Sequence, residues 1–148
     1  MENYAVVPFC EEHIKKAAEI EAICFSEPWS SDAMRLLCTP EYPSLALVDE
    51  SGECIGYIGS AKALDELQII NVAVDPEHRS RGLGKLLLRG FDELCVSIGA
   101  VTVSLEVRES NRVAISLYES FGYEVAGKRK GFYRAPAEDA LVMVKNCR

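Results

Sequence analysis

Apolar residues in this chain recur with two different spacings, and each spacing predicts a different kind of element. Four segments carry apolar residues every three to four positions, which is the spacing of an amphipathic helix. They are residues 13–24, about 30–38, 83–98 and 111–121. Ser30 or Ser31 is suited to cap the second helix, and Gly99 and Gly122 follow the last two, as expected of residues that end helices.

Seven further segments predict strands, several of them through alternation of apolar and polar side chains. They are residues 4–8, 44–49, 54–63, 67–74, 101–107, about 124–130 and about 139–145. A turn at residues 49–52 joins the second and third strands as a hairpin, and residues 131–138 connect the last two. Gly56 and Gly59 weaken the third segment as a strand and permit a bulge there.

The order strand, helix, strand over residues 67–107 predicts two parallel strands joined by a right-handed crossover. The fold class is therefore α/β (α+β), with a mixed sheet and helices on both faces. A chain of 148 residues fits one domain, which we expect to span residues 1–148.

Composition narrows the class of protein. Hydrophobic residues make up 49% of the chain, enough for a buried core, yet no run approaches the roughly 20 apolar residues of a membrane span. Residues 1–4 lack the basic and then apolar regions of a signal peptide, so a cytoplasmic protein without membrane association is expected. The net charge of −7 disfavours general nucleic-acid binding and weakly favours basic substrates.

The six cysteines form no C-x-x-C pair, and most of them adjoin apolar residues. We expect reduced thiols that pack as small hydrophobic side chains. A zinc site needs clustered ligands, and neither His13 nor His78 pairs with a suitable residue in the sequence. No metal is therefore expected.

Residues 72–85 run from a predicted strand into a predicted helix and carry two glycines, Gly82 and Gly84, at the junction. The N-terminus of a helix offers unpaired N–H groups and a positive dipole end, and glycine lets an anion approach those groups closely. Four cations surround the junction: Arg79, Arg81, Lys85 and Arg89. The pattern predicts a phosphate site. The alternative is a glycine-rich turn with a solvated basic face.

Two familiar phosphate loops are excluded by spacing. A Walker A loop requires glycine where Arg79 stands and serine or threonine where Leu86 stands. A dinucleotide-binding fingerprint requires a small residue at Leu87.

The six residues 79–84 (R-S-R-G-L-G) match the R/Q-x-x-G-x-G/A signature of the GCN5-related N-acetyltransferase (GNAT) family, which this chain resembles. The resemblance implies a mixed, mostly antiparallel sheet of six to seven strands, splayed where the two parallel strands separate. It also implies acetyl-CoA as the cosubstrate, with its pyrophosphate on the loop amides and its pantetheine arm along the preceding strand. The implied binding residues are Val72, Ala73, Val74, Arg79, Ser80, Arg81, Gly82, Leu83, Gly84, Lys85 and Asn111.

Four further motifs resemble the bacterial RimI group within that family. They are residues 24–30 (C-F-S-E-P-W-S), 105–108 (L-E-V-R), 110–115 (S-N-R-V-A-I) and 117–123 (L-Y-E-S-F-G-Y). That group acetylates the N-terminal alanine of ribosomal small-subunit protein eighteen. The resemblance, which covers residues 25 to about 133, implies a protein N-terminus as the acceptor, on a ribosomal protein.

Acetyl transfer to an amine needs a base for the amine proton and a proton donor for the departing thiolate. Glu106 lies on the polar face of the strand at residues 101–107, where a salt bridge is the alternative role. The resemblance implies that Glu106 is the general base, acting through water. An α-amine with a pKa near 8 is easier to deprotonate than a lysine near 10.4, by roughly 3 kcal/mol at neutral pH.

Asn111 and Tyr118 lie seven residues apart, on one face of the predicted helix. Asn111 is a good helix cap in its own right, and the resemblance adds a contact with acetyl-CoA. Tyr118 is either a core residue or, as the resemblance implies, the general acid for the CoA thiolate.

The acceptor residues are expected in two connections that flank the incoming N-terminus in relatives. Phe25, Glu27 and Trp29 lie in the first, and Tyr133 lies in the last, with local packing as the alternative role of the aromatic side chains. Glu27, or else Glu138 or Asp139, is a candidate partner for a basic second residue of the acceptor.

Two other functions fit the same cosubstrate site. One is acetylation of a small amine, such as a polyamine or an antibiotic, or of another protein N-terminus. The other is a non-catalytic module that binds CoA. Residues 25–30 favour a protein N-terminus, and the joint presence of Glu106 and Tyr118 favours an enzyme. The sequence does not fix the oligomeric state.

Overall fold

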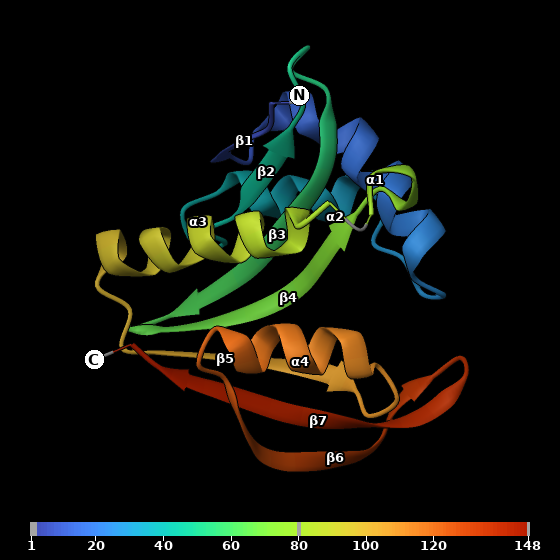
Figure 1. Cartoon of the computed structure of the whole chain (residues 1–148), viewed down its shortest axis with the longest axis vertical. Helices are drawn as coiled ribbons and strands as arrows, with labels where there is room; N and C mark the ends of the chain where they lie inside the picture. Colours follow the sequence, from blue (N-terminus) through green and yellow to red (C-terminus); the bar gives the residue numbers. More distant parts are fainter. Residues whose placement is uncertain (1–2, 80, 148) are drawn as a thin grey trace.

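A computed structural model describes residues 3–79 and 81–147, and within them seven strands form one sheet of order β1-β2-β3-β4-β5-β7-β6 (Figure 1). The strands are β1 (Ala5–Pro8), β2 (Leu45–Val48), β3 (Cys54–Ala63), β4 (Glu66–Val74), β5 (Thr102–Arg108), β6 (Glu124–Arg134) and β7 (Ala137–Asn146). The α-helices are α1 (Ile14–Cys24), α2 (Ser31–Met34), α3 (Leu83–Ile98) and α4 (Arg112–Ser120). Short 3₁₀ helices are η1 (Glu11–His13), η2 (Arg35–Cys38) and η3 (Pro76–His78).

The two central strands are parallel, and they separate halfway along their length. β4 and β5 pair only from Glu66 to Ile69 and from Thr102 to Leu105, whereas all other neighbouring strands in the described residues pair in antiparallel fashion. Beyond Ile69 the first strand keeps only β3 as its partner, and beyond Leu105 the second keeps only β7. Figure 1 shows the two strands diverging from this point. The predicted mixed sheet with a splayed parallel pair is confirmed.

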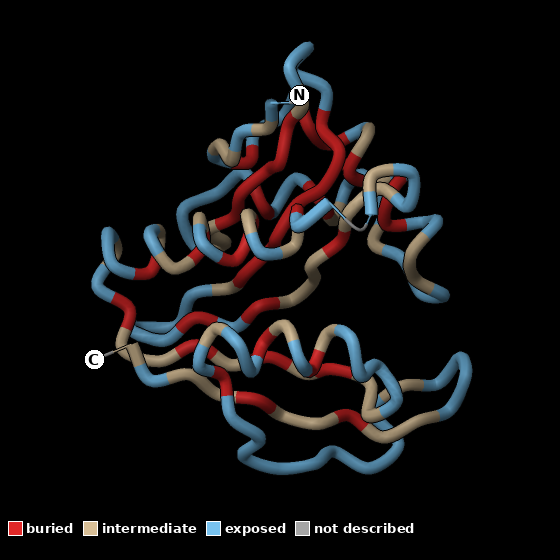
Figure 2. The backbone as a smooth tube through the Cα atoms, viewed as in Figure 1, coloured by how far each residue is buried: buried red, intermediate tan, exposed pale blue. Residues whose placement is uncertain are grey.

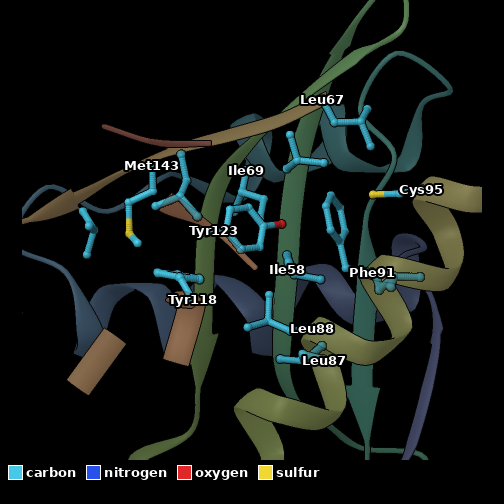
Figure 3. Packing of buried hydrophobic residues seen from close by; sticks show 14 of the residues in the cluster. Ile58, Leu67, Ile69, Leu87, Leu88, Phe91, Cys95, Tyr118, Tyr123 and Met143 are labelled. Atoms are coloured by element: carbon cyan, nitrogen blue, oxygen red, sulfur yellow. The ribbon is translucent and has the colours of Figure 1, made fainter. Parts of the chain in front are cut away.

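Helices cover both faces of the sheet, as predicted. On one face, α3 and α4 bury Leu87, Phe91 and Tyr118 in the larger core cluster (Figure 3). On the other face, Ile20 of α1 and the residues of α2 and η2 pack against Tyr57 in a second cluster. Each such side chain contributes about 1.5–3 kcal/mol by leaving water. Figure 2 shows the buried positions concentrated in the middle of the sheet, while β6 is exposed along nearly all its length.

Irregular pairing next to Gly56 confirms the predicted bulge on β3, and a second irregularity, next to Gly59, has its extra residue on β4 instead. The pairs Leu47–Gly56 and Val48–Cys54 leave one extra residue on β3. The pairs Gly59–Asn71 and Ser60–Ile69 leave one extra residue, Ile70, on β4. A one-residue insertion exchanges the faces of the following side chains. Asn71 therefore faces α1, where its side-chain amide donates to Glu21.

The predicted connection at residues 131–138 is wrong, because the strands continue through most of it. β6 extends to Arg134 and β7 begins at Ala137, so that only two residues form the turn. The pairs Arg129–Ala140 and Tyr133–Glu138 leave two extra residues on β6 between them. Gly131, at φ +63°, belongs to this bulge. Tyr133 therefore lies on a strand.

The second predicted helix is also less regular than expected. Ser30, rather than Ser31, is its cap, because the Ser30 hydroxyl accepts a hydrogen bond from the backbone N–H of Ala33 over 3.1 Å. One α-helical turn then tightens into the 3₁₀ helix η2.

Candidate functional site

The glycine loop joins the end of β4 to the start of α3, as predicted. Gly82 is the N-cap of α3 and adopts a left-handed conformation, with φ +74°, which glycine reaches without steric strain. A glycine cap has no side chain to bind the first N–H groups of the helix, so these remain available to a ligand. Lys85 is exposed on the first turn. Ser80, a predicted ligand, lies outside the described residues.

Two arginines of the loop contact other elements. The Arg79 guanidinium donates to Sγ of Cys24, at the end of α1, over 3.2 Å. The Arg81 guanidinium donates to the hydroxyl of Tyr4, ahead of β1, over 2.9 Å. Both side chains are exposed, so their charges face solvent at the start of α3. The loop therefore combines positive charge with fixed attachments on two sides.

The second glycine of the loop has a packing role that the sequence did not reveal. A Cβ on Gly84 would lie 3.2 Å from Cδ2 of Leu117, so the missing side chain lets α3 approach α4 closely. The approach of the two helices brings the predicted phosphate site next to the helix that carries Asn111 and Tyr118.

The end of β4 has an edge that no other strand of the described residues covers. Val72, Ala73 and Val74 pair with β3 on one side, while β5 has already left on the other. An uncovered edge presents backbone N–H and C=O groups that can pair with an extended ligand. Three predicted ligands thus lie on this edge, directly before the glycine loop.

Glu106 lies at the point where the strands separate, one residue beyond the last paired residue of β5. Its side chain is 12% exposed. Nε2 of Gln68 donates to both carboxylate oxygens, over 3.1 and 2.9 Å, and Nη1 of Arg129 forms an ion pair with Oε1 over 2.9 Å. The salt bridge that the sequence allowed as an alternative role is therefore present, and Glu106 is also placed in the split.

The helix α4 carries the two other predicted residues. The side chain of Asn111 caps the helix by accepting from the backbone N–H of Ala114 over 3.2 Å, so the capping role is confirmed. Tyr118 is buried against Tyr123, with ring centroids 5.8 Å apart. Burial, and to a lesser extent the neighbouring Tyr133, raises the pKa of Tyr118 to about 12. The phenol therefore keeps its proton at neutral pH.

Burial and charged neighbours shift the pKa of Tyr133 in opposite directions. Burial raises the pKa of Tyr133, Arg108 lowers it, and Glu106 raises it. The phenol of Tyr133 therefore lies near charges of both signs, those of Arg108 and Glu106.

Arg108 organises the turn between β6 and β7, a role that the sequence did not reveal. Its guanidinium donates to the backbone oxygens of Pro136 and Ala135, over 2.9 and 3.2 Å. It also pairs with Glu138 over 3.2 Å and lies 4.3 Å from the centre of the Tyr133 ring. The sequence showed Arg108 inside a motif, but its partners lie 27 to 30 residues away.

The two connections expected to flank the acceptor are in contact. The Ser26 hydroxyl donates to the backbone oxygen of Ala135, which joins residues 25–30 to the turn between β6 and β7. Phe25 and Trp29 are half-buried against the cluster beneath α1 and α2, so they also have a packing role. Trp29 lines a narrow crevice, with Ile70 and Asn71, that is too small for a water molecule.

Of the three candidate carboxylates for a basic acceptor residue, two are already engaged. Glu138 pairs with Arg108 and accepts from the backbone N–H of Ser110 over 2.6 Å, and these contacts lower its pKa. Asp139 accepts from the backbone N–H of Gly131 over 2.8 Å. Glu27 is exposed, with no hydrogen bond or ion pair to any other described residue.

Some cysteines are buried, as predicted, and others are exposed. Cys54 and Cys95 are buried, and burial raises their thiol pKa values to about 11 and 12, as suits small hydrophobic side chains. Cys10 and Cys38, in contrast, are exposed.

The prediction that His13 has no suitable neighbour for a metal site is wrong, because ligand atoms of Cys10 and Glu12 lie within 4.8 Å of its ring nitrogen. Nδ1 of His13 already accepts from the backbone N–H of Cys10 over 3.1 Å.

The helices of the described residues are all too short or too polar to span a membrane.

Comparison with known proteins adds a family and a set of relatives. The sequence profile of the Acetyltransferase (GNAT) family matches residues 14–123. A putative [ribosomal protein bS18]-alanine N-acetyltransferase of Bacillus subtilis is 41% identical over 134 residues, which cover 89% of this chain and 88% of the relative.

Two solved structures show the same fold. The ribosomal-protein-S18-alanine N-acetyltransferase of Escherichia coli superimposes with a TM-score of 0.90 at 30% identity, covering 98% of this chain and 94% of that one. NAA60 of Arabidopsis thaliana, crystallised in complex with acetyl-CoA, superimposes with a TM-score of 0.86 at 19% identity, covering 97% of this chain and 99% of that one. The second likeness is one of fold alone.

Proposed function

The chain belongs to the GNAT family of acetyltransferases, and on that premise we propose that it acetylates the N-terminal alanine of ribosomal protein bS18 with acetyl-CoA. The observation that carries the proposal is the placement of Glu106 at the split between β4 and β5, beside an uncovered strand edge that leads into the glycine loop. The bS18 acceptor is that of the two relatives described above, from Bacillus subtilis and Escherichia coli, which are 41% and 30% identical to this chain over most of its length. One domain, spanning residues 1–148, performs the reaction, in the cytoplasm.

The residues around α3 and β4 fit acetyl-CoA. Its pyrophosphate needs N–H donors and positive charge, and the start of α3 offers both, with Arg79, Arg81 and Lys85 nearby. Its pantetheine arm carries amides that suit the uncovered edge of β4 at Val72, Ala73 and Val74. Acetyl-CoA supplies an acetyl group activated as a thioester. Asn111 adds an amide donor at the start of α4.

Glu106 accepts the proton of the acceptor's α-ammonium group, either directly or through a water molecule. Arg129 holds one oxygen of this carboxylate, so the incoming ammonium takes the place of the guanidinium. Gln68 keeps the carboxylate in place meanwhile, because its amide donates to both oxygens. A positioned general base of this kind contributes about 10²- to 10⁴-fold to a rate.

Tyr118 provides the hydrogen bond for the departing thiolate. Its pKa is raised to about 12, so transfer of its proton to a thiolate of pKa near 8.5 is uphill by about 5 kcal/mol. At this pKa, a hydrogen bond from the intact phenol stabilises the thiolate at a lower free-energy cost than full proton transfer. Full proton transfer requires the bound ligands to lower the pKa of Tyr118.

The first connection and the turn between β6 and β7 form the acceptor groove. Phe25, Trp29 and Tyr133 supply apolar surface for the first residue of the acceptor. Glu27 pairs with a basic second residue, because it is the candidate carboxylate that has no other partner among the described residues.

Acetyl transfer onto a panel of peptides with free N-termini tests the proposal. The panel includes an Ala-Arg peptide, an N-terminally blocked peptide with an internal lysine, and spermidine as a small amine. We expect the Ala-Arg peptide to have the highest kcat/KM. Faster acetylation of lysine or spermidine than of every free N-terminus would contradict the acceptor, and absence of turnover with all amines would indicate a module that only binds CoA.

A further inference from the structure

A buried carboxylate beneath the acceptor groove has no part in the steps described above. Glu21, in the last turn of α1, is 1% exposed, and no salt bridge reaches it from the described residues. A buried charge without an ionic partner costs several kcal/mol unless hydrogen bonds compensate it. The stability of a carboxylate at this position therefore depends on its hydrogen bonds.

Donors from three other elements surround this carboxylate. Nδ2 of Asn71, on β4, donates to its two oxygens over 3.1 and 3.0 Å, and the hydroxyl of Tyr57, on β3, donates to Oε1. The backbone N–H of Trp29 donates to Oε2 over 2.9 Å. The amide of Asn71 and the backbone of Trp29 present only hydrogens to it. Both oxygens of Glu21 must therefore accept, which is what a carboxylate does and an amide does not.

The same residue fixes both ends of the first acceptor connection. The backbone N–H of Phe25 donates to the backbone oxygen of Glu21 over 3.0 Å, and that of Trp29 donates to its side chain. The next residue, Ser30, begins α2 as its cap. Residues 25–29 are thus a short loop whose two ends are bonded to one residue.

The carboxylate also joins this loop to the strand that precedes the glycine loop. Asn71 follows the bulge at Ile70, in the part of β4 that has separated from β5. Without the extra residue, the side chain of Asn71 would face the other side of the sheet. Glu21 therefore connects the strand edge proposed for the pantetheine arm with the loop proposed for the acceptor.

We propose that Glu21 is a positioning residue, whose carboxylate fixes residues 25–29 to β4 and so sets the place of the acceptor N-terminus relative to the thioester. The inference rests on the proposed function, and it adds a residue that does not itself contact either substrate. A displacement of about 1 Å at such a site can cost 10²-fold in rate, so a rigid attachment of the loop has catalytic value.

Glu21→Gln is the test variant, since it keeps the shape and turns one acceptor into a donor that faces Asn71 or Trp29. We expect at least a tenfold increase in KM for the Ala-Arg peptide and less than a twofold change in the Kd of acetyl-CoA. Glu19→Gln, on an exposed position of the same helix, is the matched control and should change neither constant. Tyr57→Phe removes one donor only and should have a smaller effect of the same kind.

A reversed pair separates positioning from general loss of structure. In the double variant Glu21→Gln with Asn71→Asp, the new amide donates to the new carboxylate, and we expect the peptide KM to recover at least threefold. Hydrogen exchange at the Trp29 amide gives a direct reading of the bond to Glu21. We expect at least tenfold faster exchange at this amide in Glu21→Gln, without a matching change in the strands.

The outcomes are distinct. An unchanged peptide KM together with unchanged protection of the Trp29 amide in Glu21→Gln would overturn the inference. If Glu21→Gln does not fold, Tyr57→Phe and Asn71→Ala carry the same test, and wild-type values in both variants would overturn it equally. If the wild-type protein acetylates no peptide, the proposed function fails, while amide exchange still decides whether Glu21 holds the loop.

Discussion

Arg129 of β6 forms an ion pair with Glu106 of β5, with 2.9 Å between Nη1 and Oε1. The arginine side chain is 57% exposed, whereas that of the glutamate is 12% exposed. The guanidinium also lies 5.3 Å from the centre of the Phe132 ring. A cation of the chain itself thus occupies the side of Glu106 where the proposed mechanism places the α-ammonium group of the acceptor.

This pairing predicts competition between Arg129 and the acceptor. Arg129→Gln removes the competing charge, and we expect KM for the Ala-Arg peptide to fall by at least about 1.4- to 5-fold, since even an ion pair with both partners exposed is worth about 0.2–1 kcal/mol. Initial rates at varied peptide concentration measure the change. Lys130→Gln, a charge change on an exposed neighbour, is the control. A higher KM in Arg129→Gln would mean instead that the arginine helps to bind the acceptor.

Glu106→Gln tests the general base. The amide keeps the volume and one acceptor oxygen for Gln68 or Arg129 but accepts no proton at neutral pH, so we expect kcat to fall by about 10²- to 10⁴-fold. Titration calorimetry with acetyl-CoA should give an unchanged Kd, because the pyrophosphate site is proposed at the start of α3. Glu66→Gln, at the far end of β4, should retain full activity. Turnover within a factor of three of wild type in Glu106→Gln would remove this residue from the mechanism.

Tyr118→Phe tests the hydrogen bond to the thiolate, with an expected loss of about 10- to 100-fold in kcat at constant acetyl-CoA affinity. Because the pKa of Tyr118 is raised to about 12, its proton is present throughout the working range, and the phenol contributes no decline in rate below about pH 11. The pH–rate profile of Tyr118→Phe should therefore have the wild-type shape at a lower level. A decline near pH 9 that disappears in the variant would contradict this assignment.

The same raised pKa has a consequence for stability. The folded protein holds the Tyr118 proton more tightly than the unfolded chain, whose tyrosines have pKa values near 10. The stabilising contribution is complete below about pH 10 and is lost as the pH rises through about 12. Denaturant titrations over this range should show a smaller pH dependence of the free energy of unfolding in Tyr118→Phe than in wild type.

Glu27→Gln tests the preference for a basic second residue. We expect kcat/KM to fall by about 2- to 5-fold for an Ala-Arg peptide and to stay constant for an Ala-Ala peptide, since an exposed ion pair contributes up to about 1 kcal/mol. The difference should shrink at 0.5 M salt, where exposed charges are screened. Equal effects on both peptides would show that Glu27 does not read the second residue.

Features that depend on neighbours in the chain were predictable from the sequence. The glycine loop is one, because a strand, a left-handed Gly82 and the start of a helix follow one another within residues 72–85. The face of Glu106 is another, because side chains alternate along a strand. The split of the parallel pair was expected from the family resemblance, and the pairing of β4 with β5 places it after Ile69 and Leu105.

Contacts across the sequence were not predictable. The partners of Glu106 lie 38 and 23 residues away, and Arg108 meets the turn between β6 and β7 through residues at least 27 positions distant. The sequence predicts a connection at residues 131–138, which contains Tyr133, whereas pairing with β7 keeps β6 extended around a two-residue bulge. The pairing of β6 with β7 therefore outweighed the local sequence pattern, which favoured a connection at these residues.

By itself, the sequence determined the order of elements, the strand-to-helix junction at Gly82 and the polar face that carries Glu106, since these follow from local backbone preferences and side-chain periodicity. Only the tertiary structure decided that Arg129 pairs with Glu106 and that Glu21 is hydrogen-bonded to residues 25–29. The reason is the register between β3 and β4. One extra residue on β4, Ile70, determines which side of the sheet Asn71 faces, and therefore whether its amide can donate to the carboxylate of Glu21. Local patterns do not encode a register, which is settled when distant strands pair.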